Sequence, residues 1–521
     1  MLQAIAVADL REDLASGGRE VIETHISLVF LGEHDVIKVK KPVSLGFVDY
    51  GTPERRRRAC EDEVRLNSRL APGVYLGVEA ITRSPEGVYR LGGGGAPVDW
   101  AVRMKRLEDR CRADLRLAAG TLEEPWLHAL AGRLAHFHAD APGGPSVSRH
   151  GALDAVRATI RENFDDARAS IGRYVSEQQA REIERWQLAF LEENGDLFDG
   201  RVRAGRIREG HGDLRLEHVY LDDDGRATVI DCVEFSARLR CCDVCADVAF
   251  LAMDLTWNDR DAWAERFLAA YASEANDFDL YPLVDFYESY RAFVRGKVSS
   301  ILADDAAAAP AAREHAAAQA RRYYLLALAS ARRRFEPPRL IAVGGIIGAG
   351  KSTLAAALSH ALSVPTVSSD LARKFMMAAQ PYDRLLDREG RGGKWEGAYA
   401  SDRTVAVYSE LARRASAVLR SGRTVVVDAS FREAEQRHRF ERLAEERGVR
   451  FLFIEAHAPR EVCRARLEAR GRHVSDARED LLDEFATRWE RTDGLTPDRR
   501  LTVDTSASLQ EAVRAVRRRL G

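Results

Sequence analysis

A glycine-rich loop in the last third of the chain carries the clearest chemical signal. Residues 345–352 read GIIGAGKS and fit the pattern G-x-x-x-x-G-K-[ST], with the apolar run RLIAVGG leading into them and an Ala- and Leu-rich helix after them. In such a loop the backbone N–H groups and the N-terminus of the following helix bind phosphate oxygens. The residues expected to contact a nucleotide lie in this loop and the first turn of its helix: Gly345, Gly348, Ala349, Gly350, Lys351, Ser352 and Thr353.

Two side chains of the loop would complete this site. The ammonium of Lys351 can reach the β- and γ-phosphates, and the hydroxyl of Ser352 can hold Mg²⁺. A chance match to the pattern is the alternative, but Lys is rare in this Arg-rich chain and both flanking elements are of the required kind. We therefore predict ATP and Mg²⁺ as ligands of this region.

Carboxylates end two of the apolar runs beyond the loop. PTVSSD ends at Asp370 and TVVVD ends at Asp428, and in open parallel sheets ligands bind at the carboxyl ends of the strands. A carboxylate there can accept a proton from a hydroxyl or support Mg²⁺, and we assign the Mg²⁺ role to Asp428. Each Asp could instead cap a following helix. Arg466 and Arg470 share a helix face that either closes over phosphates or faces solvent.

A second pair of carboxylates lies before residue 240. Asp213 stands in the loop segment His211-Gly212-Asp213, and Asp231 ends the run ATVID. In protein-kinase-like phosphoryl transfer, one loop carboxylate deprotonates the attacking hydroxyl and one carboxylate at a strand end holds Mg²⁺. We predict these roles for Asp213 and Asp231. The alternative is that HGD is only a tight turn.

The same chemistry needs a strand lysine that is paired with a helix glutamate. Lys38 falls in the middle of an expected strand, with Lys40 on the same face because strand side chains alternate. Glu63, or less favourably Glu61, lies on the next expected helix. We favour Lys38 with Glu63, against the alternative that lysines 38–41 are a charge patch on an edge strand.

Hydrophobic periodicity indicates the elements that position these residues. Residues 20–40 are expected to form strand, turn and strand, and residues 54–70 a helix. Helices predominate in 121–200 and 243–330, and 227–235 between them is expected to be a strand. After the prolines of FEPPRL, strands alternate with helices, which is typical of a parallel sheet with crossover helices.

Residues 338–521 resemble the small P-loop kinases related to zeta toxins, chloramphenicol phosphotransferase and the kinase half of polynucleotide kinases. The resemblance rests on GGIIGAGKST, SSDLARK, VVVDASF and the arginine-bearing helix after them. It implies that Asp370 is the base toward the acceptor hydroxyl and that Arg373 contacts substrate or phosphate. It also implies that Arg466 and Arg470 belong to a lid.

Residues 20–330 resemble the aminoglycoside phosphotransferase family. HGDL, the Asp in VIDCVEF and the segment DVCADVAFLAMDL carry the resemblance, which implies a two-lobed, protein-kinase-like α+β fold. The whole chain is similar to bacterial fusions of such a domain with a P-loop kinase. The implied fold class is α/β multidomain: an N-lobe over 1–107, a helical C-lobe over 108–334, and a P-loop domain with a parallel sheet over 338–521.

Two features depart from that family. Its members usually have Asn five residues after the loop Asp as a second metal ligand, and here that position is His218, whose imidazole is a poorer partner for Mg²⁺. No convincing glycine-rich phosphate loop precedes Lys38. The N-terminal domain is therefore either a kinase in which Asp231 and His218 hold Mg²⁺, or a domain that binds a ligand or nucleotide without chemistry.

Composition narrows the remaining classes. The 521 residues are 45% hydrophobic and 31% charged, and 79 Lys+Arg against 81 Asp+Glu give a net charge of −2, which argues against a dedicated nucleic-acid or membrane binder. There is no apolar run of about 18 residues and no signal-like start, so we expect a cytoplasmic protein. Seven cysteines do not describe a disulfide framework.

These observations support two function hypotheses and weaken a third. The first is an ATP- and Mg²⁺-dependent phosphotransferase that modifies a small hydroxylated substrate at one or both sites. The second is a P-loop ATPase switch coupled to a catalytically impaired, kinase-like ligand-binding domain. Asp370 separates them, because transfer needs a base beside an acceptor pocket whereas a switch needs a residue that orients water. The third, a polynucleotide 5′-kinase, fits poorly with the near-neutral charge.

Overall fold

The computed structural model describes eight stretches of the chain: residues 7–16, 18–45, 48–93, 95–306, 308–331, 337–379, 400–469 and 481–521. Its contacts divide the chain into two units. Residues 1–258 with 290–327 form the N-terminal unit, and residues 259–289 with 328–521 form the C-terminal unit. The segment 259–289 therefore groups with the C-terminal unit, although it falls within the expected helical C-lobe. The domain limits expected from the sequence stay predictions.

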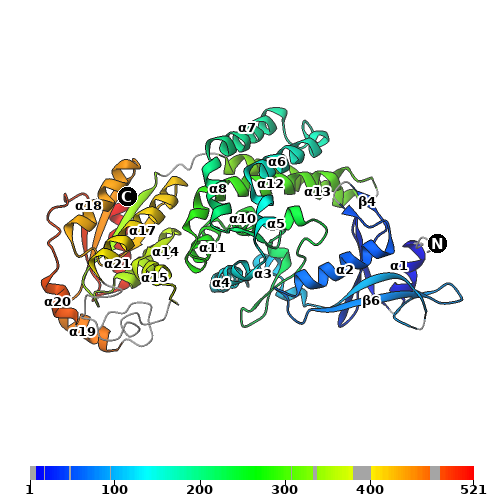
Figure 1. The fold of residues 1–521 in the computed structure, drawn as a ribbon, viewed down its shortest axis with the longest axis horizontal. Helices are drawn as coiled ribbons and strands as arrows, with labels where there is room; N and C mark the ends of the chain where they lie inside the picture. Colours follow the sequence, from blue (N-terminus) through cyan, green and yellow to red (C-terminus); the bar gives the residue numbers. More distant parts are fainter. Residues whose placement is uncertain are drawn as a thin grey trace. The chain divides into compact units, whose positions relative to one another are not determined.

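A six-stranded antiparallel sheet begins the N-terminal unit (Figure 1). Its strands lie in the order β1, β2, β3, β8, β6, β7, with the bounds Glu20–Glu23, Ser27–Leu31, Asp35–Lys40, Pro97–Lys105, Tyr75–Arg83 and Tyr89–Leu91. The β2–β3 hairpin confirms the strand, turn and strand expected within 20–40, and β1 is an additional strand that was not expected there. Because side chains alternate along a strand, one face of the hairpin packs against helix α1 (Val7–Ala15) through Leu28, Phe30, Ile37 and Val39.

Helix α2 (Pro53–Asn67) packs on strands β8 and β6 of this sheet and carries Glu63. The Thr52 hydroxyl accepts a hydrogen bond from the N–H of Arg55, and proline occupies the first turn, both of which favour a helix start. The helix expected over 54–70 is confirmed except for its last three residues. Two very short strands, β4 (Ser44–Leu45) and β5 (Val48–Asp49), precede it.

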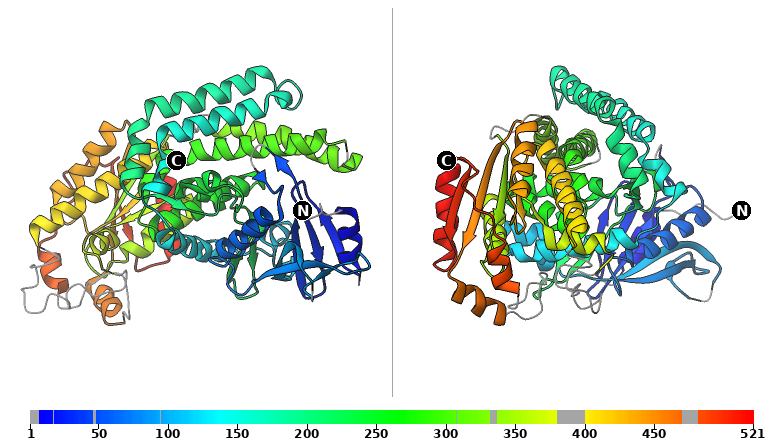
Figure 2. Two further views of the ribbon diagram at one scale, coloured as in Figure 1. Left: turned by 45° about the vertical axis from the view of Figure 1, so that its right-hand side comes forward. Right: turned by 60° about the vertical axis from the view of Figure 1, so that its left-hand side comes forward.

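Helices form most of the remainder of the N-terminal unit, as expected (Figure 2). Their bounds are α3 Ala113–Ala118, α4 Glu124–Asp140, α5 Pro145–Ser148, α6 Leu153–Asp166, α7 Glu177–Glu193, α8 Gly195–Arg203, α9 Ala237–Arg240, α10 Val244–Trp257 and α13 Pro310–Ser330. Helix α12 (Tyr281–Asp304) begins in the C-terminal unit and continues into this one. Within the eight described stretches, no helix combines the length and the apolar character that a membrane span requires.

Two pairs of short antiparallel strands frame the HGD segment. Strand β9 (Ile207–Glu209) pairs with β12 (Cys241–Asp243), and β10 (Val219–Leu221) pairs with β11 (Ala227–Val229). The strand expected over 227–235 is wrong beyond Val229. Asp231 has a φ of +64°, a left-handed conformation that a strand cannot contain, so its carboxylate lies on a loop rather than at a strand end.

A buried carboxylate holds the HGD segment in place. Asp247 on helix α10 accepts hydrogen bonds from the backbone N–H of His211 at 2.6 Å and of Gly212 at 2.8 Å, and Nε2 of His138 lies 3.3 Å from it. Gly212 has a φ of +85°, and a Cβ there would approach the Leu239 carbonyl at 3.1 Å. The turn therefore depends on a glycine and on one carboxylate.

The C-terminal unit is built on a five-stranded parallel sheet in the order β14, β15, β13, β16, β17. The bounds are Thr366–Ser368, Val425–Asp428, Arg339–Gly344, Arg450–His457 and Arg500–Asp504. This confirms the parallel sheet expected after residue 338. Strand β13 is central, and the chain proceeds from it to both sides of the sheet, so its carboxyl end lies where open α/β sheets bind ligands.

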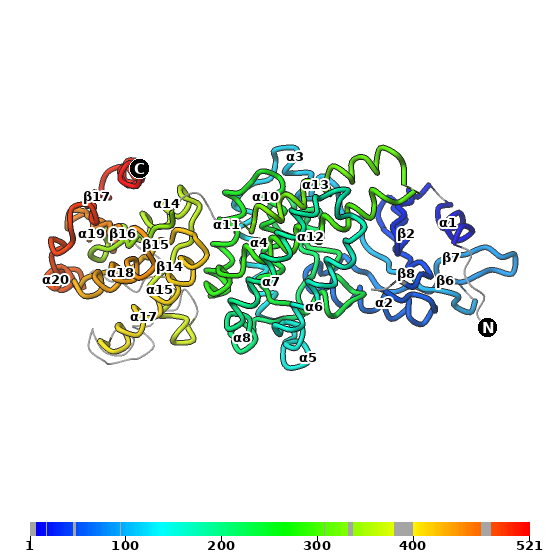
Figure 3. The backbone as a smooth tube through the Cα atoms, turned by 90° about the horizontal axis from the view of Figure 1, so that it is seen from above, coloured from blue at the N-terminus to red at the C-terminus, as the bar shows by residue number. Residues whose placement is uncertain are grey.

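Helices cover both faces of this sheet (Figure 3). Helices α14 and α21 share one apolar core with Ile341 and Val503 of the sheet. On the other face, helices α17 and α18 lie over a group of edge-to-face rings formed by Phe431, Phe440 and Phe453. The helix bounds of this unit are α11 Asp261–Glu274, α14 Lys351–Leu362, α15 Ser369–Met376, α17 Ser401–Arg420, α18 Ala434–Glu446, α19 Arg460–Glu468, α20 Leu482–Thr487 and α21 Leu509–Leu520.

A buried arginine joins the segment 259–289 to the sheet side of the C-terminal unit. Nε of Arg423, just before β15, lies 2.8 Å from Oε2 of Glu265, and its Nη2 lies 2.8 Å from Oδ1 of Asp285. The Arg423 side chain is 3% exposed. A buried guanidinium needs such partners because removing a charge from water is costly, so this contact fixes α11 and the start of α12 to the strand.

We expect replacement of Arg423 by Met to destabilise the C-terminal unit. Glu265 and Asp285 would lose the guanidinium that faces them, which costs about 3 kcal/mol for a buried pair. Hydrogen exchange of peptides from α11 and β15, followed by mass spectrometry, measures the loss. The matched control is Arg413→Met, since the Arg413–Asp279 pair is half exposed and contributes less than about 1 kcal/mol. Equal protection of these peptides from hydrogen exchange in the two variants would show that Arg423 does not fix α11 to the strand.

We expect the N-terminal unit to become less stable as the pH decreases, because of His211. Burial, opposed by Asp247, lowers the pKa of this imidazole to about 4. The folded state keeps the imidazole neutral, whereas the unfolded chain takes up a proton near pH 6.5. The contribution of His211 to the free energy of unfolding is therefore complete above pH 6.5 and is lost between about pH 6.5 and 4. The loss is about 2 kcal/mol at pH 5. Urea unfolding near pH 7 and pH 5 measures it. His211→Gln should have a correspondingly shallower pH dependence; equal slopes would refute the assignment.

Candidate active sites

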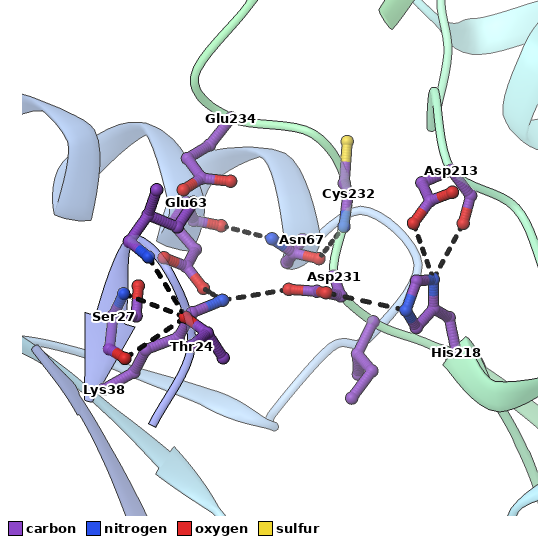
Figure 4. A network of polar contacts seen from close by, with 12 residues as sticks. Thr24, Ser27, Lys38, Glu63, Asn67, Asp213, His218, Asp231, Cys232 and Glu234 are labelled. Carbon is purple, nitrogen blue, oxygen red and sulfur yellow. Dashed lines mark hydrogen bonds and ion pairs between the residues drawn. The ribbon is translucent and has the colours of Figure 1, made fainter. Parts of the chain in front are cut away.

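Three of the side chains predicted for the N-terminal site lie together: Lys38, Glu63 and Asp231 (Figure 4). Nζ of Lys38 on β3 is 2.8 Å from Oε1 of Glu63 on α2 and 2.9 Å from Oδ1 of Asp231. The two candidate glutamates lie in different surroundings. Glu61 pairs with Arg57 on the exposed side of the helix, whereas the Glu63 side chain is 1% exposed.

Charge controls the ionisation of this group. Lys38 and, less strongly, His218 hold the pKa of Asp231 far below its ordinary value against the effect of burial. Burial alone would lower the pKa of Lys38, but Asp231 and Glu63 raise it. The Asp231 side chain is 46% exposed, so an ionised carboxylate is presented to solvent beside an ammonium. This arrangement can bind phosphate and a hard cation.

Asp213 and His218 complete the N-terminal site. Nδ1 of His218 lies 2.7 Å from the backbone oxygen of Asp213, and its Nε2 lies 3.6 Å from Oδ2 of Asp231. Arg215 donates two hydrogen bonds to the Asp213 carboxylate, at 3.1 and 3.2 Å. Although burial raises the pKa of Asp213, Arg215 and His218 lower it well below its usual range. The carboxylate is thus ionised and, with 29% of the side chain exposed, accessible.

The predicted phosphate loop follows β13 and enters α14 in the C-terminal unit. Gly345, Gly348 and Gly350 have φ values of +144°, +78° and +80°. A Cβ would come within 2.4 Å of the Ala456 carbonyl oxygen at Gly345 and within 2.7 Å of the Cys463 carbonyl oxygen at Gly348. Only glycine fits such positions, so the backbone forms the concave N–H-lined turn that binds phosphates.

Side chains of the loop contact its own backbone and the end of strand β15. Nζ of Lys351 donates to the Ile346 carbonyl at 2.9 Å, which keeps the ammonium over the turn. Ser352 and Thr353 are exposed in the first turn of α14, and Ala349 is buried beneath the turn. The hydroxyl of Ser352 hydrogen-bonds to Asp428, which ends β15 as predicted.

Asp370 lies near Asp428 but not at the end of a strand. Strand β14 ends at Ser368, and Asp370 is in the first turn of α15, because the chain enters the helix directly after the strand. The two carboxylates are close enough to interact electrostatically. Burial raises the pKa of Asp428 to about 6, and the negative charge of Asp370 adds to this rise. The Ser352 hydroxyl and the Lys351 ammonium oppose it. Lys351, Ser352, Asp370 and Asp428 therefore form one site.

The three predicted arginines differ in their placement. Arg373 is buried on α15, near enough to Tyr408 to oppose in part the rise that burial causes in the pKa of its phenol. Arg466 lies against the phosphate loop, with Nη1 3.4 Å from the Gly348 carbonyl and Nη2 2.6 Å from the backbone oxygen of Thr505. Arg470 lies outside the described residues.

Sequence reasoning missed several residues that hold these sites. The Thr505 hydroxyl donates to the Ala349 carbonyl at 2.6 Å. It follows β17, so the strand-end rule that identified Asp428 would have found it. Arg215 could have been noted two residues after Asp213. Strand alternation placed Lys40 on the same face as Lys38 but gave it no partner, and in the structure it contacts Oε2 of Glu63 at 2.6 Å.

The residues of both sites fit ATP and Mg²⁺, although in different ways. The C-terminal site has a backbone turn that a Cβ at Gly345 or Gly348 would distort by colliding with neighbouring carbonyls, with hydroxyl and carboxylate oxygens of the kind Mg²⁺ prefers. The N-terminal site has the ammonium of Lys38 and the Asp231 carboxylate, with the less suitable imidazole of His218. Its first hairpin turn, Thr24-His25-Ile26, contains no glycine.

Comparisons with known proteins give a family model and several similar solved structures. A family model described as an AAA domain matches residues 340–492. A gluconokinase from Sinorhizobium meliloti is similar to 36% of this chain over 93% of its own, with 21% identity and a TM-score of 0.26. A choline/ethanolamine kinase family protein from Mesorhizobium loti is similar to 63% of this chain over 99% of its own, with 12% identity and a TM-score of 0.35.

Two mycobacterial proteins are similar over most of their length. The chain is 34% identical over 473 residues to Uncharacterized protein Rv2004c of Mycobacterium tuberculosis and equally to Uncharacterized protein Mb2027c of Mycobacterium bovis, which covers 90% of this chain and 90% of each relative. The match spans both units, so it concerns the fusion and not one half of it. The chain therefore belongs to the family of these mycobacterial proteins, and its residues 340–492 match the AAA domain.

Proposed function

We propose that the protein is an ATP- and Mg²⁺-dependent phosphotransferase with two nucleotide-binding sites, which transfers the γ-phosphoryl group to a hydroxyl of a small molecule. One observation supports this most strongly: each unit brings together an ammonium, a carboxylate beside it and a second carboxylate nearby. The sets are Lys38, Asp231 and Asp213 in the N-terminal unit, and Lys351, Asp428 and Asp370 in the C-terminal unit. We also keep the domain limits 1–107, 108–334 and 338–521 as part of the proposal.

In the N-terminal unit, Asp213 would accept the proton of the acceptor hydroxyl. Its lowered pKa keeps it ionised, and Arg215 orients it through two hydrogen bonds. Lys38, oriented by Glu63, would bind phosphate oxygens, and Asp231 with His218 would hold Mg²⁺.

In the C-terminal unit, the backbone of 345–350 and Lys351 would bind the β- and γ-phosphates. Ser352 and Asp428 would hold Mg²⁺, and Asp370 would act as the base, with Arg373 directed to substrate or phosphate. ATP would supply the γ-phosphoryl group, with ADP as the leaving group, and Mg²⁺ would neutralise charge on the phosphates. The residues of the chain position the groups and stabilise developing charge, which accounts for most catalysis in phosphoryl transfer.

A second candidate function is an ATPase switch in which the N-terminal unit binds a ligand without chemistry. One observation favours it: an imidazole, His218, stands between Asp213 and Asp231 where an amide oxygen would suit Mg²⁺ better. Under this alternative only the C-terminal unit turns over nucleotide, and no labelled phosphate reaches an acceptor.

We expect Lys351→Ala to silence the C-terminal site without unfolding it. The ammonium that faces the phosphates would be lost, and nucleotide turnover at this site should fall by about 10²–10³-fold. Calorimetric titration with Mg²⁺ and a non-hydrolysable ATP analogue should show two sites in the natural chain and one in the variant. Lys297→Ala is the control, since Lys297 pairs with Asp166 away from both constellations. If Lys351→Ala still bound the analogue at two sites with unchanged affinity, residues 345–352 would not be a phosphate-binding loop.

We expect Asp213→Asn to abolish phosphorylation by the N-terminal unit. An amide cannot accept the hydroxyl proton, and loss of a general base lowers the rate by about 10²–10⁴-fold. The measurement is transfer of label from γ-labelled ATP to a metabolite pool. Both chains compared also carry Lys351→Ala, so that only the N-terminal unit can transfer label. Asp224→Asn, an exposed carboxylate, is the control. Undiminished transfer in the Asp213 variant would exclude the kinase-like mechanism.

A further inference from the structure

A second lysine of strand β3 lies in a buried network. Nζ of Lys40 is 2.6 Å from Oε2 of Glu63 and forms an ion pair with Oε1 of Glu234, to which the Tyr50 hydroxyl donates at 3.0 Å. The side chains of Lys40, Glu63 and Glu234 are 0%, 1% and 5% exposed. We call the four residues Lys40, Tyr50, Glu63 and Glu234 the Lys40 clasp.

Stability alone does not account for the clasp. Burial would lower the pKa of Lys40, and Glu234 and Glu63 raise it above its ordinary value, so these partners keep the lysine charged inside the protein. Replacing a buried ion pair with apolar side chains of similar volume is often neutral or stabilising, and the best-attested role of such pairs is to fix one arrangement of the chain. The segments that the clasp joins therefore indicate its role.

The clasp holds the segment that carries Asp231. Asp231 has a φ of +64°, a conformation that costs a non-glycine residue on the order of 1 kcal/mol and persists only where its surroundings enforce it. Its N–H donates to the Tyr75 hydroxyl at 3.3 Å, and the N–H of Cys232 donates to Oδ1 of Asn67 at 2.8 Å. The clasp holds the other end of this short segment at Glu234, three residues after Asp231.

The clasp also sets how the charge of Glu63 is shared. Lys38 faces its Oε1 and Lys40 faces its Oε2. Three carboxylates, those of Glu63, Asp231 and Glu234, thus face two ammonium groups. Without Lys40, the ammonium of Lys38 would be attracted by all three carboxylates and drawn away from Asp231.

We propose that Lys40 is a positioning residue of the N-terminal site: through the clasp it holds Asp231 and Glu63 in the orientation in which Lys38 and Asp231 can bind phosphate and Mg²⁺. The inference rests on the proposed function, because it concerns the same site. It assigns no chemical step to Lys40, whose buried ammonium does not reach solvent.

The test uses the full chain with Lys351→Ala, so that the N-terminal site alone reports. Lys40→Met, which keeps the volume and removes the charge, is compared with Lys41→Met, whose lysine pairs with Glu23 outside the clasp. Two quantities are measured: hydrogen exchange of residues 231–234 without nucleotide, and the Mg²⁺ concentration that half-saturates binding of a non-hydrolysable ATP analogue. Tyr50→Phe removes a single hydroxyl from the clasp and serves if Lys40→Met fails to fold.

We expect Lys40→Met to accelerate exchange at 231–234 and to raise the half-saturating Mg²⁺ concentration about tenfold, the usual effect of losing a residue that orients a metal ligand. Tyr50→Phe should shift both in the same direction by about two- to threefold, and Lys41→Met should shift neither. A purely structural role would lower the unfolding temperature without changing the Mg²⁺ requirement of the folded protein.

The outcomes separate this inference from the proposed function. If Asp231→Asn abolishes Mg²⁺-dependent binding while Lys40→Met behaves like Lys41→Met, the positioning role is refuted and the function stands. If Lys40→Met does not fold and Tyr50→Phe leaves both quantities unchanged, the positioning role is refuted as well. If the Asp231 variant binds as tightly as its parent, the Mg²⁺ site is not there and both proposals fall.

Discussion

A lysine that is to bind phosphate must be held charged, and in one place, by groups of the protein itself. This constraint shapes both units. In the N-terminal unit, Lys38 is fixed by the carboxylates of Glu63 and Asp231, which come from a helix and from a distant loop. In the C-terminal unit, Lys351 is fixed by the Ile346 carbonyl of its own loop. The surrounding strands and helices serve to bring these partners within 3 Å.

The two solutions differ in what they demand of the sequence. The P-loop site is local: three glycines with positive φ and one lysine lie within seven residues, and the sheet has only to present the turn. The N-terminal site is assembled from charges far apart in the chain, such as Lys38 and Asp231. Side-chain ion pairs between separate segments need the whole fold to be in register, whereas a backbone cradle needs mainly glycine.

This difference explains how much could be predicted. Spacing and periodicity along short segments were enough to predict the P-loop, the strand that ends at Asp428 and the elements that carry Lys38 and Glu63. Asp370 was placed on a strand because the run PTVSSD reads as one strand, although Ser368 at the N-cap and Asp370 in the first turn also favour a helix start. The turn at Asp231 was missed because a positive φ at a non-glycine residue is imposed by tertiary contacts. The Lys40 clasp depends on residues up to 194 positions apart, which no local pattern contains.

The assignment of residues 259–289 to the C-terminal unit has a consequence for synthesis on the ribosome. Glu265 precedes Arg423, its partner, by 158 positions. At roughly 5–20 residues per second, α11 emerges on the order of ten seconds before the strand it packs against exists. Helix α11 and the start of α12 therefore lack their partner strand while residues 290–327 complete the N-terminal unit. The two units cannot be completed strictly one after the other.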